Sequence, residues 1–269
     1  MRWIGETPSV AARQLPFFAA LGEQIPPRPA CGGGGREAVG GGLRMTSIID
    51  THYSAYAAGD MEGVLATLTD DYTVAPFGGK PWLTSREGAR KMYARHIKTY
   101  PMDRTDVLGR IELGNVVIKR EHSRPADGVS DPVADVMPIY TLRDGLMARC
   151  DSVTGEGDEA ANVAVAVAQL DAYNAQDLDA HVAYFADNVV IADFNGAENL
   201  HGVEAYRERY KGVFAQYPGN HAELIDRLAC ANVVVDHERV SRETGGPTFD
   251  VLAIYSFVGG KIARVDFVK

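Results

Sequence analysis

The sequence has little of what marks several classes of protein. No apolar run approaches the roughly 20 residues that a membrane-spanning helix needs. Lys and Arg number 27 against 36 Asp and Glu, which gives a formal net charge of −9 at pH 7. Nucleic acids and anionic membranes are both bound by clustered cations. The sequence therefore argues against either as a partner.

Cysteine is scarce as well. The three cysteines, Cys31, Cys150 and Cys230, are odd in number and widely spaced, so they favour neither a disulfide framework nor a zinc site. The histidines show no metal-binding spacing, and no glycine-rich stretch has the context of a phosphate-binding loop. We expect a cytoplasmic protein that needs no metal ion and no other cofactor.

The first 44 residues differ in composition from the rest of the chain. They contain prolines at 26, 27 and 29 and glycines at 32–35 and 40–42. Such a segment has little apolar surface to bury and is costly to order, so we expect 1–44 to be disordered. Periodic sequence begins just after Met45. Residues 1–44 are therefore either an upstream extension or a genuine flexible arm.

The remaining residues repeat themselves once. A shift of 117 residues aligns Tyr93 with Tyr210 and Glu121 with Glu238, and after an indel a shift of 115 aligns Tyr140 with Tyr255. A register kept over about a hundred residues indicates duplication of a whole domain. We place the first repeat at 45–153, a linker at 154–158 and the second repeat at 159–269.

Each repeat is predicted to fold as two helices, a strand, a third helix and four further strands. In the second repeat, helices are expected over 161–173, from residue 178 and over 203–217, and strands at 189–191, 222–229, 233–242, 249–258 and 261–268. Three helices followed by an antiparallel meander give an α+β fold. We expect two tandem cone-shaped domains, each with three helices packed on a curved antiparallel sheet that encloses a small-molecule pocket.

Short motifs in the second repeat resemble a known family. Residues 192–196 read Ala-Asp-Phe-Asn-Gly, residues 200–202 read Leu-His-Gly, and Tyr210 lies on the helix that follows. This pattern is similar to the ketosteroid isomerase and SnoaL-like cyclase group of the nuclear transport factor 2-like superfamily. The resemblance covers 46–153 and 160–269 and implies the fold given above. It leaves the reaction open, because the fold hosts isomerases, dehydratases, cyclases, epoxide hydrolases and plain binding proteins.

The resemblance gives Asp193 the position of the proton-shuttling carboxylate of ketosteroid isomerases. At the mouth of an apolar cone its ionised form would be desolvated and its pKa raised, which suits acid–base chemistry near neutrality. The alternative is that Asp193 is an ordinary turn residue before Asn195 and Gly196. The first repeat has Pro76 at the same position, and proline cannot transfer a proton.

The resemblance also implies an oxyanion hole made by a Tyr and a protonated Asp. The corresponding positions hold Gln169 and Leu252 in the second repeat and His52 and Met137 in the first. Both donors are missing, so steroid isomerisation by that mechanism is not expected. The first repeat lacks an acid at Pro76 and at Met137, and we expect it to be degenerate.

Strand parity indicates which other side chains face the cone. If Leu252 points inward, Asp250 shares its face, and on the neighbouring strand His237 and Arg239 also point inward, with residues 236 and 238 outward. An inward His237 beside Asp250 would be a tunable acid–base pair. A one-residue error in register would turn His237 outward, and Asp250 can instead form a plain ion pair with Arg239.

These residues predict a cofactor-independent acid–base enzyme whose active pocket lies in the second repeat. The reaction would be of the isomerase, cyclase, dehydratase or epoxide hydrolase type, on a small hydrophobic polyketide-, terpenoid- or steroid-like substrate. The alternative is a non-catalytic ligand-binding or accessory protein with two cone-shaped pockets. The candidate catalytic residues are Asp193, His237 and Asp250, and the candidate substrate-binding residues are Gln169, Tyr210, Arg239, Leu252, Val265 and Phe267.

The family resemblance also implies pairing through the outer faces of the sheets. Because the two copies are joined in one chain, we expect an intramolecular pseudo-dimer, favoured by an effective concentration of roughly millimolar order. A further homodimer of the whole chain stays open.

Overall fold

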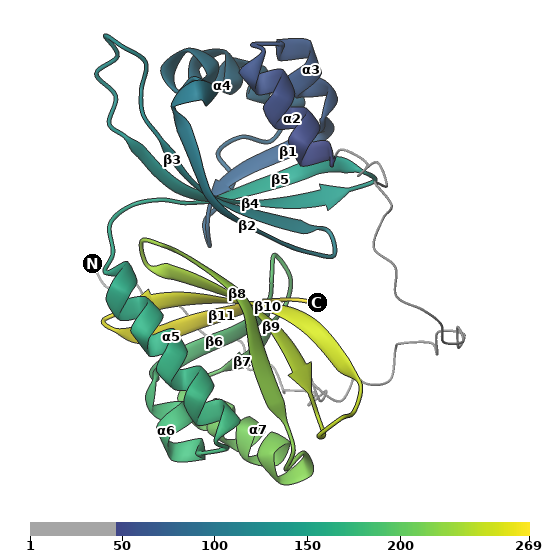
Figure 1. The fold of residues 1–269 in the computed structure, drawn as a ribbon, viewed down its shortest axis with the longest axis vertical. Helices are drawn as coiled ribbons and strands as arrows, with labels where there is room; N and C mark the ends of the chain where they lie inside the picture. Colours follow the sequence, from purple (N-terminus) through teal and green to yellow (C-terminus); the bar gives the residue numbers. More distant parts are fainter. Residues whose placement is uncertain (1–46) are drawn as a thin grey trace, which may run out of the picture. The chain divides into compact units, whose positions relative to one another are not determined.

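The computed structural model of the protein describes residues 47–269, which lie within one compact unit. The disorder expected for 1–44 concerns residues outside this range. Both repeats show the same succession of helices and strands (Figure 1). The first repeat contains α2 (Ile48–Ala57), α3 (Met61–Ala66), β1 (Leu68–Pro76), α4 (Arg86–Thr99), the 3₁₀ helix η1 (Met102–Arg104), β2 (Thr105–Leu113), β3 (Val116–Ser123), β4 (Ala134–Arg143) and β5 (Leu146–Val153).

The second repeat contains the matching elements and one additional short strand, β7. Its elements are α5 (Glu159–Asn174), α6 (Leu178–Ala183), β6 (Phe185–Asp193), β7 (Glu198–His201), α7 (Val203–Gln216), β8 (His221–Cys230), β9 (Val233–Ser241), β10 (Thr248–Val258) and β11 (Lys261–Val268). The element bounds keep the offsets of the sequence repeat, since β1 begins at residue 68 and β6 at 185, and β5 begins at 146 and β11 at 261. The predicted tandem α+β fold is confirmed.

Side-chain caps fix where the helices begin. Ser47 and Asp50 form a capping box at the start of α2, and the Asp177 carboxylate accepts from the Ala180 N–H at 3.0 Å at the start of α6. Ile49 and His52 are three residues apart and lie on one face of α2. Both are buried, and His52 is only 3% exposed.

Each sheet is mixed, which corrects the predicted antiparallel sheet. The strand order is β1-β5-β4-β3-β2 in the first repeat and β7-β6-β11-β10-β9-β8 in the second. The last four strands of each repeat pair antiparallel as predicted. β1 is parallel to β5, and β6 is parallel to β11. A parallel neighbour requires a long crossover, and in each repeat a helix and at least three strands separate the first strand from its parallel partner.

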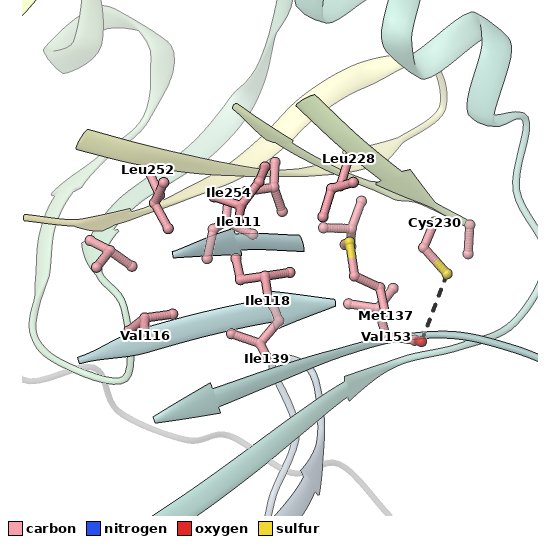
Figure 2. Close-up of a cluster of buried hydrophobic side chains, with 14 residues drawn as sticks. Ile111, Val116, Ile118, Met137, Ile139, Val153, Leu228, Cys230, Leu252 and Ile254 are labelled. Carbon is pink, nitrogen blue, oxygen red and sulfur yellow. Dashed lines mark hydrogen bonds between the residues drawn. The ribbon is translucent and has the colours of Figure 1, made fainter. Parts of the chain in front are cut away.

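The sheet faces that the helices leave uncovered meet each other. Fourteen buried side chains from both repeats form one hydrophobic cluster between the two sheets (Figure 2). They are Ile111, Val116, Ile118, Met137, Ile139 and Val153 of the first repeat and Leu228, Cys230, Ala231, Val233, Val235, Leu252, Ile254 and Val268 of the second. Removal of these aliphatic groups from water stabilises the contact between the repeats.

Two further contacts bring the repeats close. A Cβ on Gly109 of β2 would lie 2.4 Å from Leu228 Cδ2 of β8, so these strands approach as they do because residue 109 has no side chain. Arg120 of β3 donates from Nε to the Ala229 carbonyl at 2.7 Å and from Nη2 to Glu159 Oε1 at 3.1 Å. That the repeats depend on each other as the halves of a pseudo-dimer remains a prediction.

Candidate active site

A cavity of about 450 Å³ lies within the first repeat, between its helices and the inner face of its sheet. Its lining comes from α2, α4, η1 and all five strands of that sheet. The volume falls in the range of about 300–1,000 Å³ that is usual for small-molecule pockets. This cavity belongs to the repeat that we expected to be degenerate.

Side-chain size on the inner face of the sheet distinguishes the two repeats. The repeat offsets pair four small residues of the cavity lining with larger residues of the second repeat: Ser123 with Val240, Ala134 with Phe249, Cys150 with Val265, and Ser152 with Phe267. Val240, Val265 and Phe267 are buried. These larger side chains occupy in the second repeat the positions that border open space in the first.

A chain of hydrogen bonds crosses the inner end of the cavity. The Tyr53 hydroxyl donates to Glu121 Oε1 at 2.5 Å and lies 2.9 Å from the Tyr140 hydroxyl. Since the single proton of Tyr53 is directed at Glu121, Tyr140 is the donor to Tyr53. Burial raises the pKa of both tyrosines well above the ordinary value, and the Glu121 charge adds to this effect at Tyr53. Both phenols therefore remain protonated donors at neutral pH.

Lys119 supports the same carboxylate from the side away from the cavity. Its Nζ lies 3.0 Å from Glu121 Oε1 and 3.0 Å from the centroid of the Tyr53 ring. Only 7% of the Lys119 side chain and 10% of the Glu121 side chain are exposed. Burial lowers the pKa of Lys119, and the nearby Glu121 charge opposes that effect. The ammonium thus meets a carboxylate and an aromatic face in a poorly solvated position.

His52 presents a defined tautomer beside this network. The Thr67 hydroxyl donates to the Val64 carbonyl at 2.6 Å, so it accepts from His52 Nδ1, which lies 2.7 Å away. Nε2 is then the unprotonated nitrogen of the ring. Burial, with a contribution from Lys119, lowers the pKa of His52 to about 4, and the ring is neutral at pH 7.

The second repeat holds a related network of buried side chains. The Tyr255 hydroxyl donates to Glu238 Oε1 at 3.1 Å, and Gln169 Nε2 donates to Tyr255 at 3.0 Å. Asp236 accepts two hydrogen bonds of 2.6 Å from Arg227. Burial, followed by the Asp236 charge, raises the pKa of Glu238 to about 8, so its neutral form prevails at pH 7.

The prediction that His237, Arg239 and Leu252 face the interior of the cone is therefore wrong. His237 and Arg239 pair across the strands with Leu252 and Asp250, and Leu252 lies in the hydrophobic cluster between the repeats. The alternate residues 236 and 238 face the helices instead. The inward assignment of Leu252 came from the family position, and a displacement of one residue moves every side chain of a strand to the other face.

The predicted pair of His237 and Asp250 does form, but outside the cone. His237 Nε2 lies 3.0 Å from Asp250 Oδ2, and Arg239 donates to both oxygens of the same carboxylate. The Arg239 guanidinium holds the pKa of Asp250 below its usual range. The geometry of the cone gives no support to a catalytic role for this pair.

Asp193 occupies a more exposed position than we expected. It ends β6, has 41% of its side chain exposed, and lies with Oδ1 2.8 Å from Lys269 Nζ. Solvent and an ammonium group surround this carboxylate rather than an apolar cone. Its catalytic role remains a prediction.

The other predicted binding residues lie inside the second repeat. Gln169, Tyr210, Val265 and Phe267 are at most 9% exposed. Val265 pairs across the strands with Tyr255 and therefore shares its inward face. A role in ligand binding stays a prediction for these four residues.

Sequence reasoning passed over Tyr53, Glu121 and Tyr140. A signal for two of them was present, because Glu121 and Tyr140 match Glu238 and Tyr255 in the other repeat. Identity at polar positions of buried strands points to a shared inner network. Tyr53 has no such signal, since its counterpart is Leu170.

The part of the chain that the structure describes shows neither a metal-binding cluster nor a membrane-spanning helix. Among residues 47–269, no three His, Cys, Asp or Glu side chains are grouped so as to hold a metal ion. Within the same residues no helix combines the length and apolarity needed to cross a membrane.

Sequence comparison identifies the family. The SnoaL-like domain matches the chain twice, over residues 49–150 and 166–265. The protein therefore belongs to the SnoaL-like family and carries two tandem copies of its domain. No functionally curated protein matches the sequence.

Solved structures that resemble the chain are shorter than it is. An uncharacterized cystatin-fold protein from Novosphingobium aromaticivorans is 37% identical, covers 43% of this chain and 100% of its own, and has a TM-score of 0.38. A SnoaL-like protein of unknown function from Burkholderia thailandensis is 20% identical, with coverage of 42% and 98% and a TM-score of 0.37. An NTF2-like protein of unknown function from Mesorhizobium loti is 15% identical, with coverage of 42% and 93% and a TM-score of 0.37.

Proposed function

We propose that the first repeat is an acid–base enzyme domain that acts on a small, mainly apolar molecule bearing a carbonyl or enol oxygen. The observation that carries this proposal is the chain from Tyr140 through Tyr53 to Glu121 inside a cavity of about 450 Å³. It combines a carboxylate that can take a proton with a phenol that can stabilise a developing oxyanion. Reactions of the isomerase, cyclase or dehydratase type need these two groups.

Glu121 is the proposed base. Within residues 47–269 both of its close partners, Tyr53 and Lys119, lie on Oε1, so Oε2 is the oxygen available to a substrate proton. The Lys119 ammonium is paired with Oε1 at 3.0 Å. This base stands on β3, whereas the family position at the end of β1 is occupied by Pro76.

Tyr140 is the proposed oxyanion donor. The Tyr140 hydroxyl can rotate from the Tyr53 oxygen to a ligand oxygen without any movement of the ring. Its raised pKa keeps the proton on the phenol until negative charge develops on the substrate. Tyr53 remains hydrogen-bonded to Glu121 and keeps the carboxylate and the donor in a fixed relation.

A test uses α-proton exchange of 2-tetralone in D₂O, followed by proton NMR. General acid–base catalysis contributes about 10²- to 10⁴-fold, so Glu121→Gln should lower the protein-dependent exchange rate by that amount with folding intact. The matched control is Glu238→Gln, which changes the equivalent carboxyl of the second repeat and should leave the rate unchanged.

Asp193→Asn decides between the two repeats in the same assay. Asp193 is the carboxylate that the family position favours, and its replacement should change the rate less than about twofold because an exposed ion pair contributes little to its surroundings. A large loss with Asp193→Asn and none with Glu121→Gln would move the active site to the second repeat.

A second candidate function is ligand binding without chemistry. The specific observation in its favour is that the hydrogen bonds of Tyr53 are satisfied within the protein. Under this alternative, 2-tetralone or a related molecule binds the first repeat, and no variant changes its exchange rate.

A further inference from the structure

Trp82 lines the cavity of the first repeat and is nevertheless 62% exposed. A side chain with both properties marks the mouth of the cavity. An indole is a large apolar surface with a specific stacking geometry, and its exposure at such a place indicates a contact with a ligand.

The position of Trp82 is fixed by the backbone on both sides. The Trp82 N–H donates to the Val74 carbonyl at 3.0 Å, and the Val74 N–H donates to the Leu83 carbonyl at 3.0 Å. Leu83 is 6% exposed and packs in the core of the first repeat. The exposed indole therefore sits on an anchored bridge between the chain after β1 and β1 itself, which makes it a preorganised contact.

The walls of the cavity are unusually rich in rings. Nine of the lining residues carry an aromatic ring: His52, Tyr53, Tyr56, Tyr72, Trp82, Tyr93, His96, Tyr100 and Tyr140. Several of these rings meet edge to face, among them His52 with Tyr93 at 5.1 Å between centroids. Flat, conjugated molecules pack best against walls of ring faces and edges.

The second repeat provides an internal comparison for the mouth. The 117-residue offset pairs Trp82 with Asn199, and it pairs the cavity-lining Met102 with Gly219. The apolar mouth therefore accompanies the open interior and is missing where larger side chains fill the corresponding positions.

We propose that Trp82 determines the specificity of this cavity by stacking on a flat, conjugated part of the ligand that extends through the mouth. The proposal rests on the cavity of the proposed function and not on proton transfer by Glu121. The ligand class is a planar ring system with an oxygen that reaches the tyrosines at the inner end.

The test compares two probes with one carbon skeleton, 2-naphthol and decahydro-2-naphthol, by calorimetric titration. Both carry a hydroxyl, and only the first is flat. Trp82→Leu keeps an apolar side chain without a ring, so it should weaken 2-naphthol binding about tenfold and decahydro-2-naphthol binding less than twofold. Trp82→Phe should restore most of the preference for the flat probe.

Two further variants separate the roles. Leu108→Ala changes a side chain that is 61% exposed and absent from the cavity lining, and it should leave both affinities unchanged. Tyr140→Phe should weaken both probes equally, because it removes the hydroxyl that can donate to the oxygen of either probe.

Two outcomes would overturn the proposal. One is equal weakening of both probes by Trp82→Leu, which would reduce Trp82 to general apolar contact. The other is absence of 2-naphthol binding to the unaltered protein. Failure of the proposed acid–base function is distinguishable, because Glu121→Gln would then leave exchange unchanged while the preference for the flat probe persists.

Discussion

The two repeats show how one fold accommodates either small or large side chains on the inner face of its sheet. Apart from η1 and β7, their helices and strands correspond element by element, and their sheets share one strand order. The difference lies in inner-face residues such as Ser152 and its counterpart Phe267. The outer faces of both sheets remain apolar where they meet. The apolar contact between the repeats is therefore compatible with large differences in side-chain volume on the inner faces of the two sheets.

The same comparison shows opposite charges beside two equivalent buried carboxyls. Glu121 and Glu238 occupy equivalent positions and both accept from a tyrosine. Two residues earlier on each strand, the first repeat has Lys119 and the second has Asp236. The ammonium lies 3.0 Å from Glu121 Oε1, whereas burial and the Asp236 charge raise the pKa of Glu238 to about 8. A change of sign at one position thus separates a candidate base from a neutral structural group.

The largest expected effect comes from exchanging the sizes of Ser152 and Phe267. Phe267→Ala should lower the free energy of unfolding by about 3–5 kcal/mol, because it removes a buried ring and leaves a cavity. Urea denaturation measures this change. Ser152→Phe should abolish binding of 2-naphthol by filling the cavity of the first repeat, with a smaller effect on stability because open space is available there.

The control for this exchange is Phe267→Leu, which keeps most of the apolar volume and should cost less than Phe267→Ala. Retention of 2-naphthol binding by folded Ser152→Phe protein would show that Ser152 does not limit the cavity. The size of the side chains at this pair of positions would then not explain the cavity of the first repeat.

The next effect concerns pH and the neutral form of Glu238. Its pKa is about 4.5 in the unfolded chain and about 8 in the folded protein. Between these values the unfolded state binds fewer protons, so this residue contributes stability that is fully present below pH 4.5 and is lost as pH rises toward 8. The expected slope is up to roughly 1.4 kcal/mol per pH unit.

Glu238→Gln should remove this contribution, and urea denaturation at pH 5, 6, 7 and 8 measures it. The relevant quantity is the difference in slope between the variant and the unaltered protein, since other titrating groups contribute equally to both. Val240→Ala is the control: it removes apolar volume from a buried residue that cannot titrate, so it should lower stability and keep the slope. Parallel stability curves for the unaltered protein and Glu238→Gln would contradict an uncharged Glu238.

Much of the fold could be predicted because its determinants are local or repeated. The register between Tyr93 and Tyr210 and between Glu121 and Glu238 located two domains without any structural information. Helices and the final four strands followed from periodicity and from Gly and Pro signals. The parallel placement of β1 beside β5 did not follow, because pairing between strands distant in sequence leaves no local pattern.

The candidate site was harder to predict, and β9 shows why. Its two faces have nearly the same composition, with Val234, Asp236, Glu238 and Val240 on one and Val233, Val235, His237 and Arg239 on the other. Period-two reasoning cannot choose between such faces. The acidic pair turns inward because Arg227 and Tyr255, from two other strands, provide its hydrogen bonds. The cavity likewise depends on the summed volumes of side chains from many elements, which no single stretch of sequence contains.

The smallest expected effect is the energetic coupling between Gly109 and Leu228, which tests the contact between the repeats. Gly109 of β2 and Leu228 of β8 approach so closely that a Cβ at residue 109 would lie 2.4 Å from Leu228 Cδ2. Gly109→Ala should therefore cost about 1–3 kcal/mol through overpacking, moderated by the flexible end of the leucine. Leu228→Ala should cost about 2–5 kcal/mol through the cavity it leaves. In the double variant the new methyl group occupies part of that cavity. The stability lost by the double variant should therefore be smaller than the sum of the losses of the two single variants, by about 0.5–3 kcal/mol. Urea denaturation of all four proteins gives this coupling.

Gly114→Ala provides no useful control because Gly114 has a φ of +58°, and a substitution there would be strained for reasons unrelated to the interface. Strict additivity of Gly109→Ala and Leu228→Ala would mean that the sheets do not meet at this point in solution, and the pseudo-dimer would lose its main support.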